Sequence, residues 1–134
     1  MAAPEFYPTT HQLPSATLTF SSDWRLDQTG EIKIGGTLII YYSERRLDDW
    51  LQDWRHWWME SFKACVRFHP GEQFYELELF TPPVIYHPPR LVPCEVRIPD
   101  DASWVEIWFQ NSARDHMVYD SRFGQNYCFD VVSQ

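Results

Sequence analysis

Short runs of alternating apolar and polar residues recur along most of the chain, separated by turn-forming residues. In one run, Phe62, Ala64 and Val66 alternate with Lys63 and Cys65. Alternation with a period of two places one set of side chains on the same face of a β-strand, and we expect the apolar set to face a core. The predicted strands are Ala16 to Phe20, Gly36 to Ser43, Ser61 to His69, Phe74 to Phe80, Cys94 to Ile98, Trp104 to Gln110 and Asn126 to Val132.

Seven short strands with turn signals between them are typical of an antiparallel β-sandwich, so we expect an all-β, immunoglobulin-like fold. The segment 37–42 is apolar on both faces, which predicts a central strand covered on both sides. Residues 1–14 hold three prolines among polar residues, and we expect an extended N-terminal arm there. Residues 15–134 then form a single domain, because a chain of this length buries enough surface for one core.

One segment has the spacing of a helix. Between residues 43 and 60, apolar side chains such as Leu47, Leu51, Trp54 and Trp58 recur three or four positions apart, as on one helix face. We predict a tryptophan-rich helix inserted between the second and third strands, covering the outer face of the 37–42 strand. A membrane-surface helix is less favoured, since its polar face would carry Lys and Arg throughout. A dimer interface is the other alternative.

Charge and cysteine content exclude some classes of function. The chain carries 19 acidic against 11 basic residues, a formal net charge of -8, which argues against a nucleic-acid partner. No apolar run approaches the roughly 20 residues of a membrane-spanning helix. The first residues lack the basic and apolar regions of a secretion signal, and we expect a cytoplasmic location unless such a signal was removed. Cys65, Cys94 and Cys128 lie in separate predicted strands and suggest reduced thiols, with no metal and no cofactor.

Aromatic residues make up 17% of the chain and include seven tryptophans. The alternation in 104–110 places Trp104, Glu106 and Trp108 on the outward face of that strand. Flat rings stack on the apolar faces of sugar rings, while amides and carboxylates bind the hydroxyl groups. The candidate ligand-binding residues are Trp104, Trp108, Tyr119, Asp120, Gln125, Asn126 and Tyr127.

The segment 119–131 resembles the aromatic-Asp-Asn-Asn...Asn-Tyr motif of starch- and glycogen-binding sandwich modules. Ser121 and Arg122 stand where that motif has two amides. The same segment, together with residues 98–111, is similar to an uncharacterised family of small bacterial sandwich domains. The resemblance implies a sandwich fold and carbohydrate binding. The positions that match the starch-binding motif are Tyr119, Asp120, Asn126 and Tyr127.

The sequence holds no Gly-x-Ser-x-Gly turn, phosphate-binding glycine loop or His-Glu-x-x-His helix. We therefore favour a non-catalytic, carbohydrate-binding or lectin-like module. One alternative is a small cyclase or isomerase with Glu60, His69 or His87 as acid or base. Its aromatic pocket would be built from Tyr41, Trp54, Trp57, Trp58 and Tyr86. A further alternative is a protein-interaction or dimerisation domain, in which the tryptophan-rich helix or a strand edge docks a partner or a second copy.

Overall fold

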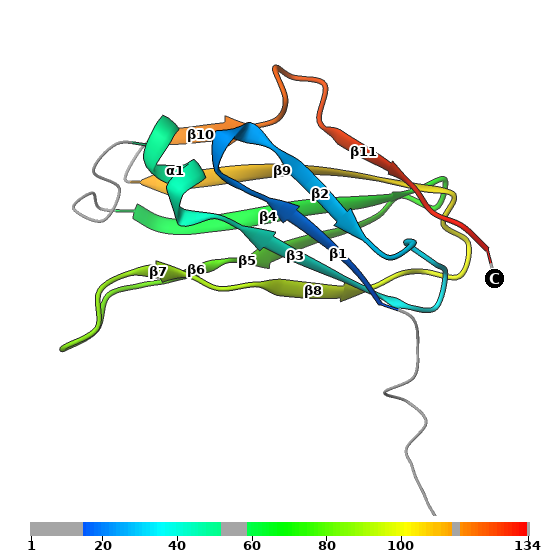
Figure 1. Ribbon diagram of the computed structural model, residues 1–134, viewed down its shortest axis with the longest axis horizontal. Coiled ribbons are helices and arrows are strands. Elements are labelled where there is room, and N and C mark those ends of the chain that lie inside the picture. Colours follow the sequence, from blue (N-terminus) through cyan, green and yellow to red (C-terminus); the bar gives the residue numbers. More distant parts are fainter. Residues whose placement is uncertain (1–14, 52–58, 114–115, 134) are drawn as a thin grey trace, which may run out of the picture.

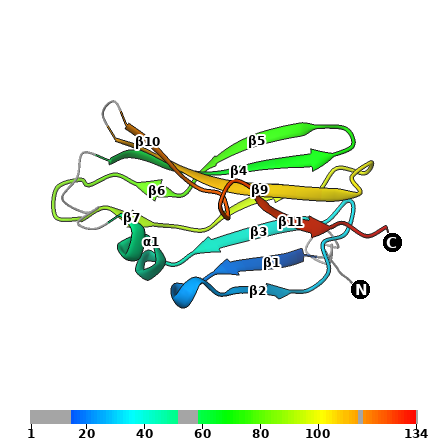
Figure 2. The same ribbon diagram turned by 90° about the horizontal axis from the view of Figure 1, so that it is seen from above.

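The computed structural model describes residues 15–51, 59–113 and 116–133. Two β-sheets face one another in a sandwich, with one short helix at one end (Figures 1 and 2). The expected all-β sandwich-like fold is confirmed. The expected N-terminal arm lies outside the described residues, and the immunoglobulin-like arrangement stays a prediction.

The first sheet has the strand order β2-β1-β3-β8. Its strands are β1 (Ser15–Phe20), β2 (Leu26–Thr29), β3 (Thr37–Tyr42) and β8 (Cys94–Arg97). Strand β3 lies between two neighbours, as its apolar sequence predicts. It runs parallel to β1, whereas β2 and β8 pair antiparallel with their neighbours. The wholly antiparallel expectation was therefore wrong at this pair, because β2 returns the chain to the starting end of β1 before β3 begins.

The second sheet has the order β10-β9-β4-β5, and β11 also pairs with β9. Its strands are β4 (Met59–His69), β5 (Gln73–Glu78), β9 (Trp104–Ala113), β10 (His116–Asp120) and β11 (Tyr127–Asp130). Strand β9 thus has β4 along one side and, along the other, β10 followed by β11. The loop 121–126 leaves the sheet between these two strands. A small hairpin of β6 (Phe80–Thr81) and β7 (Arg90–Leu91) completes the strands.

The core lies between the inner faces of the two sheets. Phe20 from the first sheet and Phe62 and Phe109 from the second are fully buried, and the rings of Phe20 and Phe109 meet edge to face at 4.7 Å. The alternation predicted for β4 and β9 is confirmed by their burial, except at Cys65, which is buried although the pattern placed it in the outward set. Along β5 and the residue after it, Tyr75, Leu77 and Leu79 share one face by alternation and are expected to point inward, but Tyr75 is exposed. As an edge strand, β5 has less of the opposite sheet to pack against.

The helix α1 spans Glu44–Trp50 and is capped by Ser43, whose hydroxyl accepts a hydrogen bond from the Arg45 N–H. Met59 and Glu60, which we placed in the helical insertion, instead begin β4. Leu47 packs into the core, so the helix closes one end of the sandwich where the chain crosses between sheets (Figure 1). The outer face of β3 is left open at Tyr41, which is exposed.

Candidate functional site

A buried ion pair joins the helix to the second sheet. The side chains of Arg46 on α1 and Asp120 on β10 are 2% and 5% exposed, and Arg46 Nε lies 3.4 Å from Asp120 Oδ2. Two tyrosine hydroxyls donate to the same carboxylate, Tyr42 at 2.6 Å and Tyr127 at 2.7 Å. Arg46 Nη2 donates to the Tyr127 oxygen at 2.6 Å, and Trp50 Nε1 donates to the Tyr42 oxygen at 2.9 Å. We call Arg46, Asp120, Tyr42 and Tyr127 the buried network.

The Arg46 guanidinium is also held by the first sheet. Its Nη1 donates to the backbone oxygen of Arg25 at 3.1 Å, and the ring of Trp24 lies 4.5 Å from the guanidinium carbon. A buried cation is tolerated only where a carboxylate, carbonyl oxygens or ring faces replace its water. All three are present here. The network therefore ties the turn after β1 to the end of β10 in the opposite sheet.

Both tyrosines of the network are held protonated. Burial, followed by the hydrogen bond to Asp120, raises the pKa of Tyr127 from 10.0 to about 12. Burial is also the largest cause that raises the pKa of Tyr42 well above its ordinary range, and the neighbouring Asp120 charge adds to it. The raised pKa values therefore extend the alkaline range over which both hydroxyls donate hydrogen bonds to the carboxylate.

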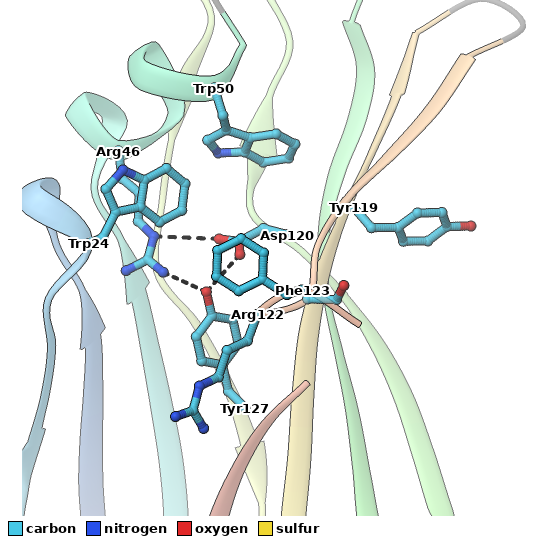
Figure 3. A pocket seen from close by; sticks show the side chains of 9 residues that line it. Trp24, Arg46, Trp50, Tyr119, Asp120, Arg122, Phe123 and Tyr127 are labelled. Carbon is cyan, nitrogen blue, oxygen red and sulfur yellow. Dashed lines mark hydrogen bonds and ion pairs between the residues drawn. The ribbon is translucent and has the colours of Figure 1, made fainter. Parts of the chain in front are cut away.

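A pocket of about 610 Å³ opens beside the buried network (Figure 3). Its lining includes the rings of Trp24, Trp50, Phe123 and Tyr127, and Arg122 is among the polar side chains. Trp24 is half exposed and Phe123 is fully exposed, so the pocket is open to solvent. Its volume lies within the roughly 300–1,000 Å³ usual for small-ligand sites, and such sites are also mainly apolar with a few polar groups.

Both walls of the pocket include residues in the left-handed backbone region. Trp24 has a φ of 59°, and Arg122 and Phe123 have φ values of 50° and 58°. Side chains other than glycine avoid this region, at a cost of about 1–3 kcal/mol each. These turns hold two aromatic rings at the mouth of the pocket. Strain of this kind concentrates at binding sites, where the surrounding structure maintains it.

A second aromatic surface covers the outer face of the five-stranded sheet. Trp104 is 39% exposed and stacks on His69 with ring centroids 4.0 Å apart. Trp108 stacks on Phe74 at 5.7 Å, and the Arg67 guanidinium lies over both of these rings. The predicted outward position of the two tryptophans is confirmed. One face of each ring is already occupied by a neighbouring side chain.

Glu106 lies between these two ring pairs and binds the loop 121–126. Its Oε1 lies 2.6 Å from His69 Nε2, and its Oε2 accepts a hydrogen bond from Asn126 Nδ2 at 2.9 Å. Burial alone would raise the pKa of Glu106, but the hydrogen bonds from Asn126 and His69 outweigh it and lower the pKa below its ordinary value. The Glu106 carboxylate therefore anchors the loop 121–126, and this loop also lines the pocket.

The structure divides the predicted ligand-binding residues into two groups. Tyr119, Asp120 and Tyr127 line the pocket. Trp104 and Trp108, by contrast, lie on the outer face of the sheet. Asn126 is bonded there to Glu106, and Gln125 is exposed in the loop.

Sequence reasoning missed six residues of the pocket, namely Trp24, Arg46, Trp50, Ser121, Arg122 and Phe123. Arg46 and Trp50 are four positions apart on α1, and this spacing could have identified them as one helix face. Trp24 and Phe123 lie in turns, for which the sequence offers no periodic signal.

The residues proposed for an enzymatic pocket are not brought together where they are described. Glu60 is exposed on β4, His69 lies on the outer sheet face, and His87 is exposed in the hairpin between β6 and β7. Tyr41 and Tyr86 are exposed at separate places on the surface. The remaining candidates, Trp54, Trp57 and Trp58, lie outside the described residues.

The thiols and other metal-binding side chains form no cluster in the described parts of the chain. The three cysteines are free, and burial is the main cause that raises the pKa of Cys65 to about 11 and that of Cys94 to about 12. Residues 15–51, 59–113 and 116–133 contain no group of three or more His, Cys, Asp or Glu side chains suited to a metal ion. Within the same ranges, no helix has the length and apolar character needed to cross a membrane.

Comparisons with known proteins give a family without a function. A search of curated proteins and a search of solved structures found no match. A family model described as a family of unknown function, DUF6209, matches residues 5–132. This match agrees with the resemblance to an uncharacterised domain family. Because it covers nearly the whole sequence, the chain belongs to this family of unknown function.

Proposed function

We propose that the protein is a non-catalytic carbohydrate-binding module whose ligand site is the pocket beside the buried network. The observation that carries the proposal is the ring-lined wall, formed by Trp24, Trp50, Phe123 and Tyr127. A sugar ring presents apolar C–H faces that stack on aromatic rings and hydroxyl groups at its edge. The pocket offers ring faces together with polar groups from Ser121 and Arg122, which matches this division.

The open mouth of the pocket favours a polar ligand over a purely apolar one. Trp24 and Phe123 remain in contact with solvent, so a bound ligand stays partly hydrated at its outer edge. An apolar molecule would gain most from a closed cavity that removes all of its surface from water. A sugar loses little by remaining partly exposed, because its hydroxyl groups continue to bond to water. Such shallow binding of a polar ligand gives affinities of roughly 10 μM to 1 mM.

The ionisable groups Asp120 and Tyr127 are occupied by hydrogen bonds within the network, which supports binding rather than catalysis. Asp120 accepts hydrogen bonds on both carboxylate oxygens and pairs with Arg46. The raised pKa of Tyr127, about 12, keeps its hydroxyl protonated. A general acid or base needs a proton that moves readily near neutral pH. The network instead fixes the shape of the pocket floor.

Affinity gel electrophoresis in starch, glycogen and other soluble polysaccharides tests the proposal, with tryptophan fluorescence as a second readout. Phe123→Ala removes a ring that lines the pocket and makes no contact with the core, because it is fully exposed. We expect a loss of binding of about tenfold, equivalent to about 1.4 kcal/mol from one ring face. Tyr86→Ala is the matched control, since Tyr86 is also almost fully exposed but lies outside the pocket. Unretarded migration in every polysaccharide, or equal effects of the two variants, would contradict the proposal.

A further inference from the structure

The hairpin between β6 and β7 projects from the sandwich (Figure 1), and three consecutive residues at its tip are apolar. Val84, Ile85 and Tyr86 are 60%, 80% and 94% exposed. Single exposed apolar residues are common on proteins, but three consecutive ones at the end of a projection mark a contact site. We call Val84, Ile85 and Tyr86 the hairpin apex.

The hairpin apex is held in a defined conformation. The Val84 N–H donates to the His87 oxygen at 3.0 Å, and the His87 N–H donates to the Val84 oxygen at 2.9 Å. These two bonds close a tight turn in which Tyr86 has a φ of 70°. Proline pairs flank the turn on both sides, at 82–83 and 88–89, and proline fixes its own backbone angle. The apolar side chains are therefore presented with little further loss of conformational entropy on binding.

The backbone near the apex is unusually poor in free hydrogen-bond donors. The four flanking prolines have no N–H group, and the N–H groups of Val84 and His87 bond to each other's oxygens. Each backbone polar group that enters lipid without a partner costs several kcal/mol. Because few N–H groups remain free there, the donor part of this cost is reduced when the hairpin approaches the apolar part of a bilayer.

The charge distribution around the hairpin also favours an approach to a bilayer. The segment 79–94 contains no Asp or Glu, although the chain has 19 of them. Its basic groups are His87 and Arg90. Two carboxylates bind the base of the hairpin from outside this segment: Glu44 accepts a hydrogen bond from the Leu91 N–H, and Glu78 accepts one from the Phe80 N–H. Contact between the apex and lipid thus requires no carboxylate of this segment to leave water.

The small, convex shape of the apex favours lipid over a protein partner. A stable protein interface buries about 800 Å² on each partner and uses roughly 20–30 residues, whereas the apex presents three side chains. A bilayer accepts a narrow apolar projection, and tyrosine is enriched where lipid meets water. We infer that the hairpin apex inserts shallowly into the interface of a lipid bilayer and gives the protein a weak, reversible membrane contact.

The net charge of the chain determines which lipids support this contact. With a formal charge of -8, the protein is repelled by anionic headgroups. Apolar insertion, by contrast, does not depend on charge. We therefore expect binding to neutral phosphatidylcholine vesicles, with no gain when phosphatidylserine is added and little change with salt.

Vesicle flotation tests the inference with phosphatidylcholine vesicles and with vesicles that also contain phosphatidylserine. We expect the wild-type protein to float with the neutral vesicles and Ile85→Ser to lower its partition coefficient about tenfold, as losing one buried aliphatic side chain does. Tyr86→Ser provides a second variant. Phe123→Ser is the matched control, because Phe123 is fully exposed in a different loop and its removal should leave flotation unchanged. Thermal melting checks that all variants fold.

Three results would overturn the inference. In the first, the wild-type protein stays unbound at millimolar lipid. In the second, Phe123→Ser lowers flotation as much as Ile85→Ser. In the third, light scattering shows that the wild type self-associates and that Ile85→Ser makes it monomeric, which would assign the apex to a protein contact. None of these results bears on carbohydrate binding at the pocket, which is measured separately and without lipid.

Discussion

Replacing Asp120 with Asn removes the anion of the buried network while keeping the shape of the side chain. In the folded protein this leaves Arg46 without its carboxylate, in a site where its side chain is 2% exposed. The new amide N–H₂ also takes the place of a carboxylate oxygen that accepts a hydrogen bond, either from Tyr42 at 2.6 Å or from Tyr127 at 2.7 Å. Breaking one partner of a buried ion pair costs about 3–5 kcal/mol. That is a large share of the roughly 5–15 kcal/mol that stabilises a typical domain.

Urea denaturation followed by circular dichroism measures this loss, provided that the m-value is unchanged. Asp100→Asn is the matched control, because Asp100 pairs with Arg97 at 3.7 Å on a largely exposed surface. That change should stay within about 0.5 kcal/mol. A double variant, Arg46→Met with Asp120→Leu, removes both charges and should be destabilised by less than the sum of the two single changes.

The reasoning fails if Asp120→Asn costs less than about 1 kcal/mol, which is the size of a surface pair. It also fails if the costs of the Arg46 and Asp120 changes simply add. Additivity would mean that the two side chains do not depend on each other, despite the 3.4 Å between Nε and Oδ2.

The other predictions concern pH, packing and one turn. The pKa of Tyr127 is raised from 10.0 to about 12, so its contribution to stability is complete below pH 10 and is lost as the pH rises to about 12. Tyr127→Phe should therefore flatten the profile of stability against pH in that range. An unchanged slope in urea titrations would refute this. The pKa of Glu106 is shifted in the opposite direction, downward, so its contribution to stability is present above pH 4.5 and is lost on acidification. Glu106→Gln should therefore lose less stability than the wild type during acid titration. A profile identical to that of the wild type would count against this prediction. Phe109→Ala empties a fully buried position and should cost about 3–5 kcal/mol in urea, with a smaller cost indicating that the core can collapse around the gap. Gly30→Ala should destabilise the domain by about 1 kcal/mol or more, since φ is +81° and the new Cβ would lie 2.9 Å from the Ser15 oxygen; an unchanged melting temperature would show that this turn relaxes.

The sheet faces could be predicted from the sequence because they follow a simple period. In β9, Val105 and Ile107 are buried and Trp104 is exposed, as alternation requires. The direction of β3 relative to β1 could not be predicted in this way. Alternation depends on the side chains of one strand and is the same for parallel and antiparallel neighbours. The path of the connecting segment decides the direction, and β2 lies within that segment.

The predicted ligand-binding residues include pocket residues only where these lie on strands. Asp120 and Tyr127 match the starch-binding motif, and both line the pocket. Trp24 and Phe123 enter it from turns with positive φ angles, and such turns leave no repeating pattern in the sequence. Arg46 was missed for another reason. Charged helix residues usually face water, and the burial of Arg46 is explained by partners distant in the sequence, above all Asp120, a residue 74 positions later at the end of β10.

The pairing of β4 with β9 has a consequence for how the protein is made. Residues 59–69 pair with residues 104–113, so the central ladder of the second sheet cannot form until β9 has left the ribosome. The first sheet differs, because β1, β2 and β3 lie within residues 15–42 and pair with one another, and only β8 is added from a distant part of the chain. We therefore expect the distant pairing of β4 with β9 to limit the rate of folding, as it does in proteins dominated by such strand pairs.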